Sequence, residues 1–277
     1  HVENISYCIE KALKDANITM EDVDAVAVTQ GPGLIGCLHV GVQAAKTLAF
    51  AYHKPLVPVH HLAGHIYANE LVVDMKYPVL ALVVSGGNTE LVYMKDETSF
   101  EILGETQDDA IGEAFDKVAR AIGLGYPGGP KIDKLAEQGK ATINFPKTHF
   151  ENLDFSFSGI KTAVINLHHK NPEVNKADLC MSFEKAVTEV LTENIEKAIK
   201  QTGIKKVVLA GGVSANTHIR EEFEKLGQKL NVQIYKPDLK LCTDNAAMIG
   251  SAGYYRYLHG DISDNTLNAV PNLKIGE

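Results

Sequence analysis

Long apolar runs are absent from this sequence of 277 residues. The longest unbroken run, residues 79–84 (VLALVV), is far shorter than the roughly 20 residues that cross a bilayer as a helix. We therefore expect no membrane span. Hydrophobic residues make up 45% and charged residues 22% of the chain, which is ordinary globular composition and argues against widespread disorder.

The sequence also has few cysteines, and its basic residues are fewer than its acidic residues. The four cysteines have no CxxC spacing and no secretory signal accompanies them, which predicts reduced thiols and a cytoplasmic location. The 27 Lys and Arg residues are outnumbered by 35 Asp and Glu residues, which leaves a formal charge of −8. This balance does not favour broad, nonspecific binding of nucleic acid, although it is compatible with a local basic patch or a basic partner subunit.

Helix-like and strand-like patterns alternate along the chain, which is typical of an α/β fold with a largely parallel sheet. Three short β runs near the middle interrupt this order and predict an antiparallel meander. We expect Asp108 and Asp109 to cap the helix that follows the meander, and Gly227 to end a later helix. The predicted strands are 23–28, 55–59, 79–84, 90–94, 100–103, 206–209 and 232–235, and the predicted helices are 2–16, 42–52, 110–122, 160–168, 178–202, 215–226 and 244–257.

Two parts of the chain echo each other, because residues 79–88 and 206–216 each run an apolar strand into a Gly-Gly pair. This echo predicts two related lobes with a boundary near residues 74–78. Residues 1–77 would form the first lobe and residues 78–277 the second, and the last helix, about 244–258, is a candidate to return to the first lobe. The chain starts at His1 directly in a helical pattern, so we interpret it as a piece of a longer protein.

Two histidines could share a metal ion. His61 and His65 are four residues apart at a predicted helix start, so they lie on one helix face, and Asp244 could complete a set of two histidines and one carboxylate. The alternatives are two unrelated histidines and an Asp244 or Thr243 that caps the last helix. Leu62 stands where a zinc protease of the HExxH type carries its glutamate, which argues against that class.

Two glycine pairs could cradle a phosphate group. Residues 85–89 (SGGNT) join two apolar strands, and Gly211-Gly212 lies between a strand and a helix, a common arrangement for binding nucleotides at a helix N-terminus. A plain hairpin turn is the alternative for the first pair. Asp116 and Asp133 have simple alternatives too, a solvated helix face for the former and a helix cap for the latter.

Taken together, the motifs resemble the glycoprotease-like family of bacterial tRNA N6-adenosine threonylcarbamoyltransferases (TsaD). The resemblance covers essentially the whole chain, in order. Its matching segments are 29–36 (TQGPGLIG), 58–65 (PVHHLAGH), 82–90 (LVVSGGNTE), 104–117 (GETQDDAIGEAFDK), 126–133 (YPGGPKID), 154–161 (DFSFSGIK), 209–216 (LAGGVSAN) and 242–250 (CTDNAAMIG).

The resemblance implies a two-lobed actin/Hsp70-like fold and transfer of a threonylcarbamoyl group from threonylcarbamoyl-AMP to N6 of the adenine next to the anticodon in tRNA. It implies that His61, His65 and Asp244 bind one metal ion, usually iron and otherwise zinc. It also implies a tRNA substrate, a homologous scaffold subunit (TsaB-like) and a small ATPase (TsaE-like). The residues that it places on the adenylate are Val83, Val84, Ser85, Gly86, Gly87, Asp116, Gly129, Asp133 and Asn216.

The chain departs from the family pattern at two points. Asn88 stands where members usually carry histidine, and the acidic strand–turn–strand segment that opens family members does not precede His1. We therefore expect residues 1–277 by themselves to be poorly stable and inactive. Two alternative functions are an ATP-dependent kinase or ATPase of the same superfamily, which would leave the three metal ligands unused, and a non-catalytic scaffold subunit, which would have no reason to carry them.

Overall fold

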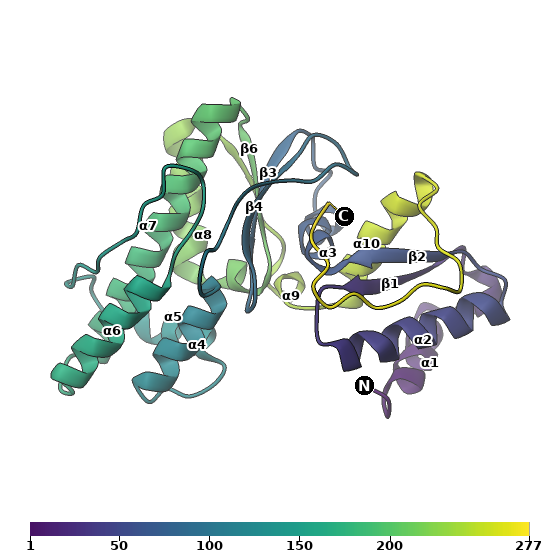
Figure 1. The fold of residues 1–277 in the computed structure, drawn as a ribbon, viewed down its shortest axis with the longest axis horizontal. Coiled ribbons are helices and arrows are strands. Elements are labelled where there is room, and N and C mark those ends of the chain that lie inside the picture. The colour runs from purple at the N-terminus through teal and green to yellow at the C-terminus, as the bar shows by residue number, and fades with distance from the viewer. Residues whose placement is uncertain (277) are drawn as a thin grey trace. The chain divides into compact units, whose positions relative to one another are not determined.

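The structure is a computed structural model that describes residues 1–276 (Figure 1). Its internal contacts divide the chain into two compact units, one formed by residues 1–71 with residues from 245 onward and the other by residues 72–244. The division falls a few residues before the predicted lobe boundary, and the last helix belongs to the first unit. Within residues 1–276, none of the helices combines the length and the apolar character needed to cross a membrane.

A five-stranded sheet forms the centre of the unit 72–244. Its strand order is β5-β4-β3-β6-β7. The first three strands in sequence form the antiparallel meander that the sequence predicts, while β6 pairs in parallel with both β3 and β7. The bounds are β3 Val79–Val84, β4 Thr89–Met94, β5 Glu101–Glu105, β6 Lys206–Ala210 and β7 Gln233–Tyr235.

Helices α4 to α8 lie together on one side of this sheet (Figure 1). Alternate residues of β3, such as Leu80 and Leu82, join Phe115 and Phe183 of the helices in one buried apolar cluster, in which the two phenyl rings meet edge to face at 5.0 Å. The bounds are α4 Ile111–Ala121, α5 Gly128–Ala136, α6 Ser158–Lys170, α7 Lys176–Thr202, the 3₁₀ turn η3 Gly212–Ala215, α8 Thr217–Leu230 and the short α9 Leu239–Cys242.

Asp108 does not cap the helix that follows it, contrary to the sequence prediction. The backbone N–H of Ile111, at the start of α4, donates instead to Thr89 Oγ1 at 3.0 Å. The Asp108 carboxylate accepts hydrogen bonds at the start of α6, from Ser156 Oγ at 2.5 Å and from the Phe157 N–H at 2.9 Å. The aspartate therefore caps a helix some 50 residues away in sequence, which local spacing could not indicate.

Asp109 is not a helix cap either, because it pairs with lysines from two helices. Its carboxylate accepts hydrogen bonds from Lys117 of α4, at 2.7 Å, and from Lys161 of α6. Burial raises the pKa of the Asp109 carboxyl, but the two lysines outweigh that effect and hold the pKa below its usual value. Asp109 thus ties α4 to α6.

Gly227 does not end its helix as predicted. Helix α8 continues to Leu230, and Asn231 stops it in the left-handed conformation with φ of 53°. A Cβ atom at position 227 would lie 2.8 Å from Cγ1 of Ile234 in the neighbouring strand β7. The glycine therefore serves the close packing of α8 on β7 rather than helix termination.

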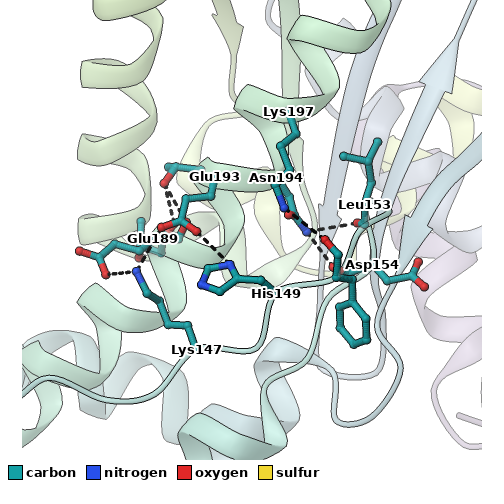
Figure 2. A network of polar contacts seen from close by, with 11 residues as sticks. Lys147, His149, Leu153, Asp154, Glu189, Glu193, Asn194 and Lys197 are labelled. Carbon is teal, nitrogen blue, oxygen red and sulfur yellow. Dashed lines mark hydrogen bonds and ion pairs between the residues drawn. The ribbon is translucent and has the colours of Figure 1, made fainter.

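The segment between α5 and α6 is held along α7 by polar contacts (Figure 2). Lys147 donates to Glu189 at 2.8 Å and to Glu193 at 3.1 Å, while Asn194 Nδ2 donates to the backbone carbonyl of Asp154 at 2.8 Å. The ion pairs are partly exposed and so contribute little individually, whereas the buried Asn194 amide satisfies loop carbonyls. Together they fix the path by which the loop leads into α6.

The unit formed by residues 1–71 and 245 onward contains the parallel strand pair β1 and β2. Helix α2 covers one face, where it packs on Val28 and Leu56. Helix α10 lies on the other face, where Gly253 comes close to Ala27 and Val59. The bounds are α1 Ile5–Ala16, η1 Met20–Asp22, β1 Val26–Gly31, α2 Ile35–Ala51, β2 Leu56–His60, α3 His61–Tyr67, η2 Asn69–Leu71 and α10 Ala246–Leu258.

The chain beyond α10 returns along this strand pair. Ser263 donates its backbone N–H to Leu56 of β2 at 2.8 Å, and Val270 donates to Gln30 of β1 at 2.9 Å. These bonds satisfy backbone groups that a two-stranded sheet leaves open at its edges. The C-terminal segment is therefore part of this unit.

Candidate functional site

A cavity of about 390 Å³ lies within the unit 72–244. Because β3 and β6 are parallel neighbours, the turns that follow them meet at the same edge of the sheet, and these turns supply Gly86 and Gly212 to the cavity wall. The N-terminal end of α5 adds Gly129 and Pro130. Ligands of open α/β sheets commonly bind at the carboxyl ends of the strands, and the volume suits a small molecule.

Five of the nine residues predicted to contact adenylate line this cavity, namely Gly86, Asp116, Gly129, Asp133 and Asn216. The other four belong to the same strand and turn. Val83 and Val84 are fully buried in β3, and Ser85 and Gly87 flank Gly86. Sequence reasoning did not select several other lining residues, among them Gly112 and Phe115 of α4, although both stand in the motif GEAFDK.

Hydrogen bonds within the turn after β3, and one from helix α4, fix the conformation of this turn. Ser85 donates its N–H to the Asn88 carbonyl at 2.9 Å, and the Asn88 N–H donates to Ser85 Oγ at 3.0 Å. Gly112 of α4 donates its N–H to the Ser85 carbonyl at 3.1 Å. Asn88 thus contributes to the turn through its peptide groups, which any residue at that position supplies.

Three glycines of the cavity wall have open space where a side chain would be. A Cβ atom on Gly86, Gly129 or Gly212 would meet no heavy atom within 4 Å, and none of the three has a backbone φ that excludes a side chain. The fold itself does not require glycine at these positions. Their missing side chains leave backbone groups exposed to whatever occupies the cavity.

Each of these three glycines has a neighbouring glycine at which a side chain would clash. Gly211 and Gly128 are the neighbours of Gly212 and Gly129 in sequence, and Gly112 is the neighbour of Gly86 in space. A Cβ atom on Gly211 would lie 2.3 Å from the Val84 carbonyl oxygen, and its φ is +89°. A Cβ atom on Gly128 would lie 2.7 Å from the Phe115 carbonyl oxygen. A Cβ atom on Gly112 would lie 2.7 Å from Cα of Gly86. The required glycines let strands and helices approach closely, and the open ones face the cavity.

The two predicted aspartates support the cavity wall. Asp116 Oδ1 accepts a hydrogen bond from the Gly128 N–H at 2.7 Å and so fixes the start of α5. Asp133 accepts from Thr217 through the backbone N–H at 3.1 Å and the hydroxyl at 3.0 Å, which fixes the start of α8. Asp116 therefore does not lie on a solvated helix face, and Asp133 caps α8 rather than its own helix.

Asn216 is the buried polar residue of the wall, with 8% of its surface exposed. Its Oδ1 atom caps α8 by accepting from the Ile219 N–H at 2.9 Å, and its Nδ2 atom donates to Glu184 Oε1 at 2.6 Å. Sequence reasoning missed Glu184 entirely. A glutamate in the middle of a long helix normally faces solvent, and no local motif marks this one as buried.

Two histidines and one aspartate come together at the start of α3. The ring centroids of His61 and His65 are 4.8 Å apart, and His65 is buried. Helix α10 packs against α3, and Asp244 directly precedes Asn245, the residue at the start of α10. One ligand atom from each of His61, His65 and Asp244 lies within 4.8 Å of the other two. Two imidazoles and a carboxylate at this spacing suit iron or zinc.

The alternative role of Asp244 or Thr243 as the helix cap is wrong. Asn245 caps α10 with its side chain, which accepts a hydrogen bond from the Met248 N–H at 2.9 Å. His60 is structural, because its Nδ1 atom accepts from the Leu62 N–H at 3.2 Å and its ring lies outside the ligand group. The aspartate carboxylate is therefore not needed to begin the helix.

Residues 1–251 match the sequence profile of the TsaD family, described as tRNA N6-adenosine threonylcarbamoyltransferase. A protein of that name from Clostridium novyi is 54% identical over the whole chain, which covers 84% of that protein. A protein of the same name from Staphylococcus aureus is 52% identical, again over the whole chain, with 83% of that protein covered.

Solved structures of HypF resemble the chain in fold. Full-length HypF in its phosphate- and nucleotide-bound form superposes with a TM-score of 0.69 at 17% identity, over 91% of this chain and 41% of HypF. HypF from T. kodakarensis gives a TM-score of 0.70 at 16% identity, over 96% of this chain and 45% of that one. The likeness confirms the predicted two-lobed α/β fold class.

Proposed function

Because the chain belongs to the TsaD family of tRNA N6-adenosine threonylcarbamoyltransferases, we propose that the cavity of residues 72–244 binds the adenylate part of the threonylcarbamoyl donor. The activity of the family is an acyl transfer that modifies adenosine in tRNA. A donor of the threonylcarbamoyl-AMP type contains a nucleotide, so the protein needs a pocket that accepts phosphate and ribose together.

The observation that carries the proposal is the group of open glycines Gly86, Gly129 and Gly212 at one cavity. Phosphate groups are commonly held by backbone N–H groups of glycine-rich turns and helix N-terminal ends, where a side chain would block their approach. Gly129 stands in the first turn of α5, and Gly212 stands shortly before α8. The phosphate is therefore best placed among these glycines.

The carboxylates Asp116 and Asp133 have a different role in the proposal. A carboxylate repels phosphate but accepts hydrogen bonds from hydroxyl and amino groups. Their remaining acceptor capacity suits the ribose hydroxyls, and their hydrogen bonds to Gly128 and Thr217 already fix where they stand. The wall thus offers both hydrogen-bond donors and hydrogen-bond acceptors to a ligand.

Replacing Gly129 with valine tests the pocket. A Cβ atom at position 129 would meet no heavy atom of the protein within 4 Å, so we expect little change in the melting temperature. It occupies the ligand's space, so we expect AMP affinity to fall more than about tenfold, which is about 1.4 kcal/mol of binding free energy. Isothermal titration with AMP measures the effect. Gly250→Ala, also in open space but on α10, is the control. Unchanged AMP affinity in Gly129→Val would refute the pocket assignment.

For the metal, we propose that His61, His65 and Asp244 bind one iron ion, with zinc as the alternative. A bound metal acts as a Lewis acid toward a carbonyl oxygen. In the transfer the adenine N6 atom forms a bond to the carbamoyl carbon, the bond from that carbon to the AMP oxygen breaks, and N6 gives up a proton. Because AMP is a good leaving group, the main task of the protein is to hold donor and adenine together in the correct orientation.

The substrate tRNA is polyanionic, and the chain carries a formal charge of −8. We propose that productive tRNA binding needs a homologous scaffold subunit and a small ATPase, TsaB-like and TsaE-like. We also propose that the protein acts in the cytoplasm. Modification of tRNA by the purified full-length protein alone should therefore be feeble and should rise strongly when both partners are added. Robust turnover by the protein alone would contradict the need for partners.

A further inference from the structure

Glu184 is a buried carboxyl group directly behind the wall of the cavity. Only 1% of its surface is exposed, although it belongs to α7, whose other glutamates, Glu189, Glu193 and Glu196, are partly exposed. Its Oε1 atom accepts the 2.6 Å hydrogen bond from Asn216 Nδ2, and its Oε2 atom has no partner within residues 1–276. A buried carboxyl with half of its hydrogen-bonding capacity unused requires an explanation beyond helix stability.

The hydrogen bond from Asn216 to Glu184 determines which polar group of Asn216 remains available to a ligand in the cavity. A carboxamide has one oxygen and two N–H groups. The oxygen of Asn216 is occupied by Ile219, and one N–H is occupied by Glu184. The polar group that remains is the second N–H, a hydrogen-bond donor, on a residue that lines the cavity. A flipped carboxamide would lose both protein bonds, so Glu184 and Ile219 together fix the orientation.

We propose that Glu184 is a positioning residue of the nucleotide pocket, which holds Asn216 so that its free amide N–H faces the ligand, and that the pocket binds nucleotide best while Glu184 is protonated and uncharged. The proposal rests on the proposed function of the cavity. The inference adds Glu184, which does not itself contact the ligand. Through Asn216 and through its own charge, Glu184 controls the polarity and the charge of the cavity wall that contacts the ligand.

The charges around Glu184 favour the protonated form. Burial, and then the carboxylate of Asp133, raise the pKa of Glu184 from 4.5 to about 8, with a smaller contribution from Glu137. The hydrogen bond from Asn216 lowers this pKa, but burial and Asp133 outweigh it. Cys180, one turn earlier on α7, is kept neutral, because burial and then Glu184 raise its pKa to about 12. His218 of α8 interacts with Asp133, and burial lowers its pKa. None of the groups that shift the pKa of Glu184 carries a positive charge.

The sign of the pH dependence follows from linkage. Below pH 7 Glu184 is mostly protonated, so nucleotide affinity is at its full value. As the pH rises through the pKa near 8, a negative charge appears behind the cavity and disfavours the anionic ligand. The second ionisation of a phosphate monoester is near pH 6, so the charge of AMP itself stays constant above pH 7. If bound AMP raises the pKa of Glu184 by about one unit, affinity falls about tenfold between pH 7 and 9.5.

The test is the AMP affinity of the full chain, measured by calorimetry from pH 7 to 9.5, for the wild type and two variants. Glu184→Gln keeps an oxygen for Asn216 but cannot ionise, so we expect the pH 7 affinity at every pH. Glu184→Leu removes the acceptor and should weaken binding several-fold at every pH. Glu189→Gln, on the exposed side of the same helix, should reproduce the wild-type profile.

The outcomes separate the inference from the proposed function. A wild type that binds AMP and loses affinity at high pH, beside a flat Glu184→Gln profile, would support the positioning role. Identical profiles for the wild type and Glu184→Gln would overturn it while leaving the pocket intact. Failure of the wild type to bind AMP at any pH would overturn the pocket itself.

Discussion

Replacing His65 with alanine in the full-length protein should remove tightly bound metal and lower threonylcarbamoyl transfer at least about 100-fold, since changes to outer-shell partners of a metal ligand already cost 10–100-fold. The reason is geometric, because His65 supplies one of three ligand atoms that lie within 4.8 Å of one another. Metal content measured by mass spectrometry of the purified protein, alongside transfer activity, gives the result. Two remaining ligands, one of them exposed, should not retain the ion.

His39→Ala is the control for this experiment. His39 is an exposed histidine on α2 and lies outside the ligand group, so its loss should change neither metal content nor transfer. Undiminished iron or zinc in His65→Ala would mean that the three residues do not form the metal centre. Loss of metal in both variants would point to instability rather than to a lost ligand.

Alanine at the neighbouring positions 211 and 212 should give opposite results. Gly211→Ala should lower the free energy of unfolding by about 2–5 kcal/mol, because its φ of +89° disfavours a side chain and the new methyl group would lie 2.3 Å from the Val84 oxygen. Gly212→Ala should leave stability within about 0.5 kcal/mol, because its methyl group meets open space. Its AMP affinity should nevertheless fall, because that space belongs to the cavity.

Chemical denaturation and AMP titration of the two variants check this prediction. The comparison is sharp because the same substitution is made one residue apart. A stable Gly211→Ala protein would show that the close approach of the two strand ends is not required. A Gly212→Ala protein with unchanged AMP affinity would show that the open glycine does not face the nucleotide.

The periodicity of apolar residues was sufficient to predict the order of the strands and of the long helices. It did not predict α5, Gly128–Ala136, or the short α9, which are absent from the predicted helices. The meander of β3, β4 and β5 and the parallel strand β6 follow from short β-rich runs bounded by turn residues. The ends of helices were harder to predict from sequence, as Asp108 and Gly227 show. Asp108 binds the start of α6, and Gly227 makes room for Ile234, so tertiary contacts override the local signals for a cap and a stop.

The residues of the candidate sites were predictable to different degrees. The spacing of His61 and His65 places them on one helix face, so they could be paired from sequence alone. Asp116 and Asp133 could not be distinguished from ordinary helix residues until the motifs around them were considered together. Glu184 could not be found at all, because its role depends on the contact with Asn216, 32 residues further along the chain.

The central claim is that the cavity beside the turns after β3 and β6 binds the adenylate. A crystal structure of the protein with AMP tests it most directly. The account predicts AMP in that cavity, with the phosphate near Gly129 or Gly212, the ribose near Asp116 or Asp133, and a hydrogen bond from Asn216 Nδ2. An AMP molecule bound elsewhere while this cavity stays empty, or one whose phosphate points at the two aspartates, would contradict it.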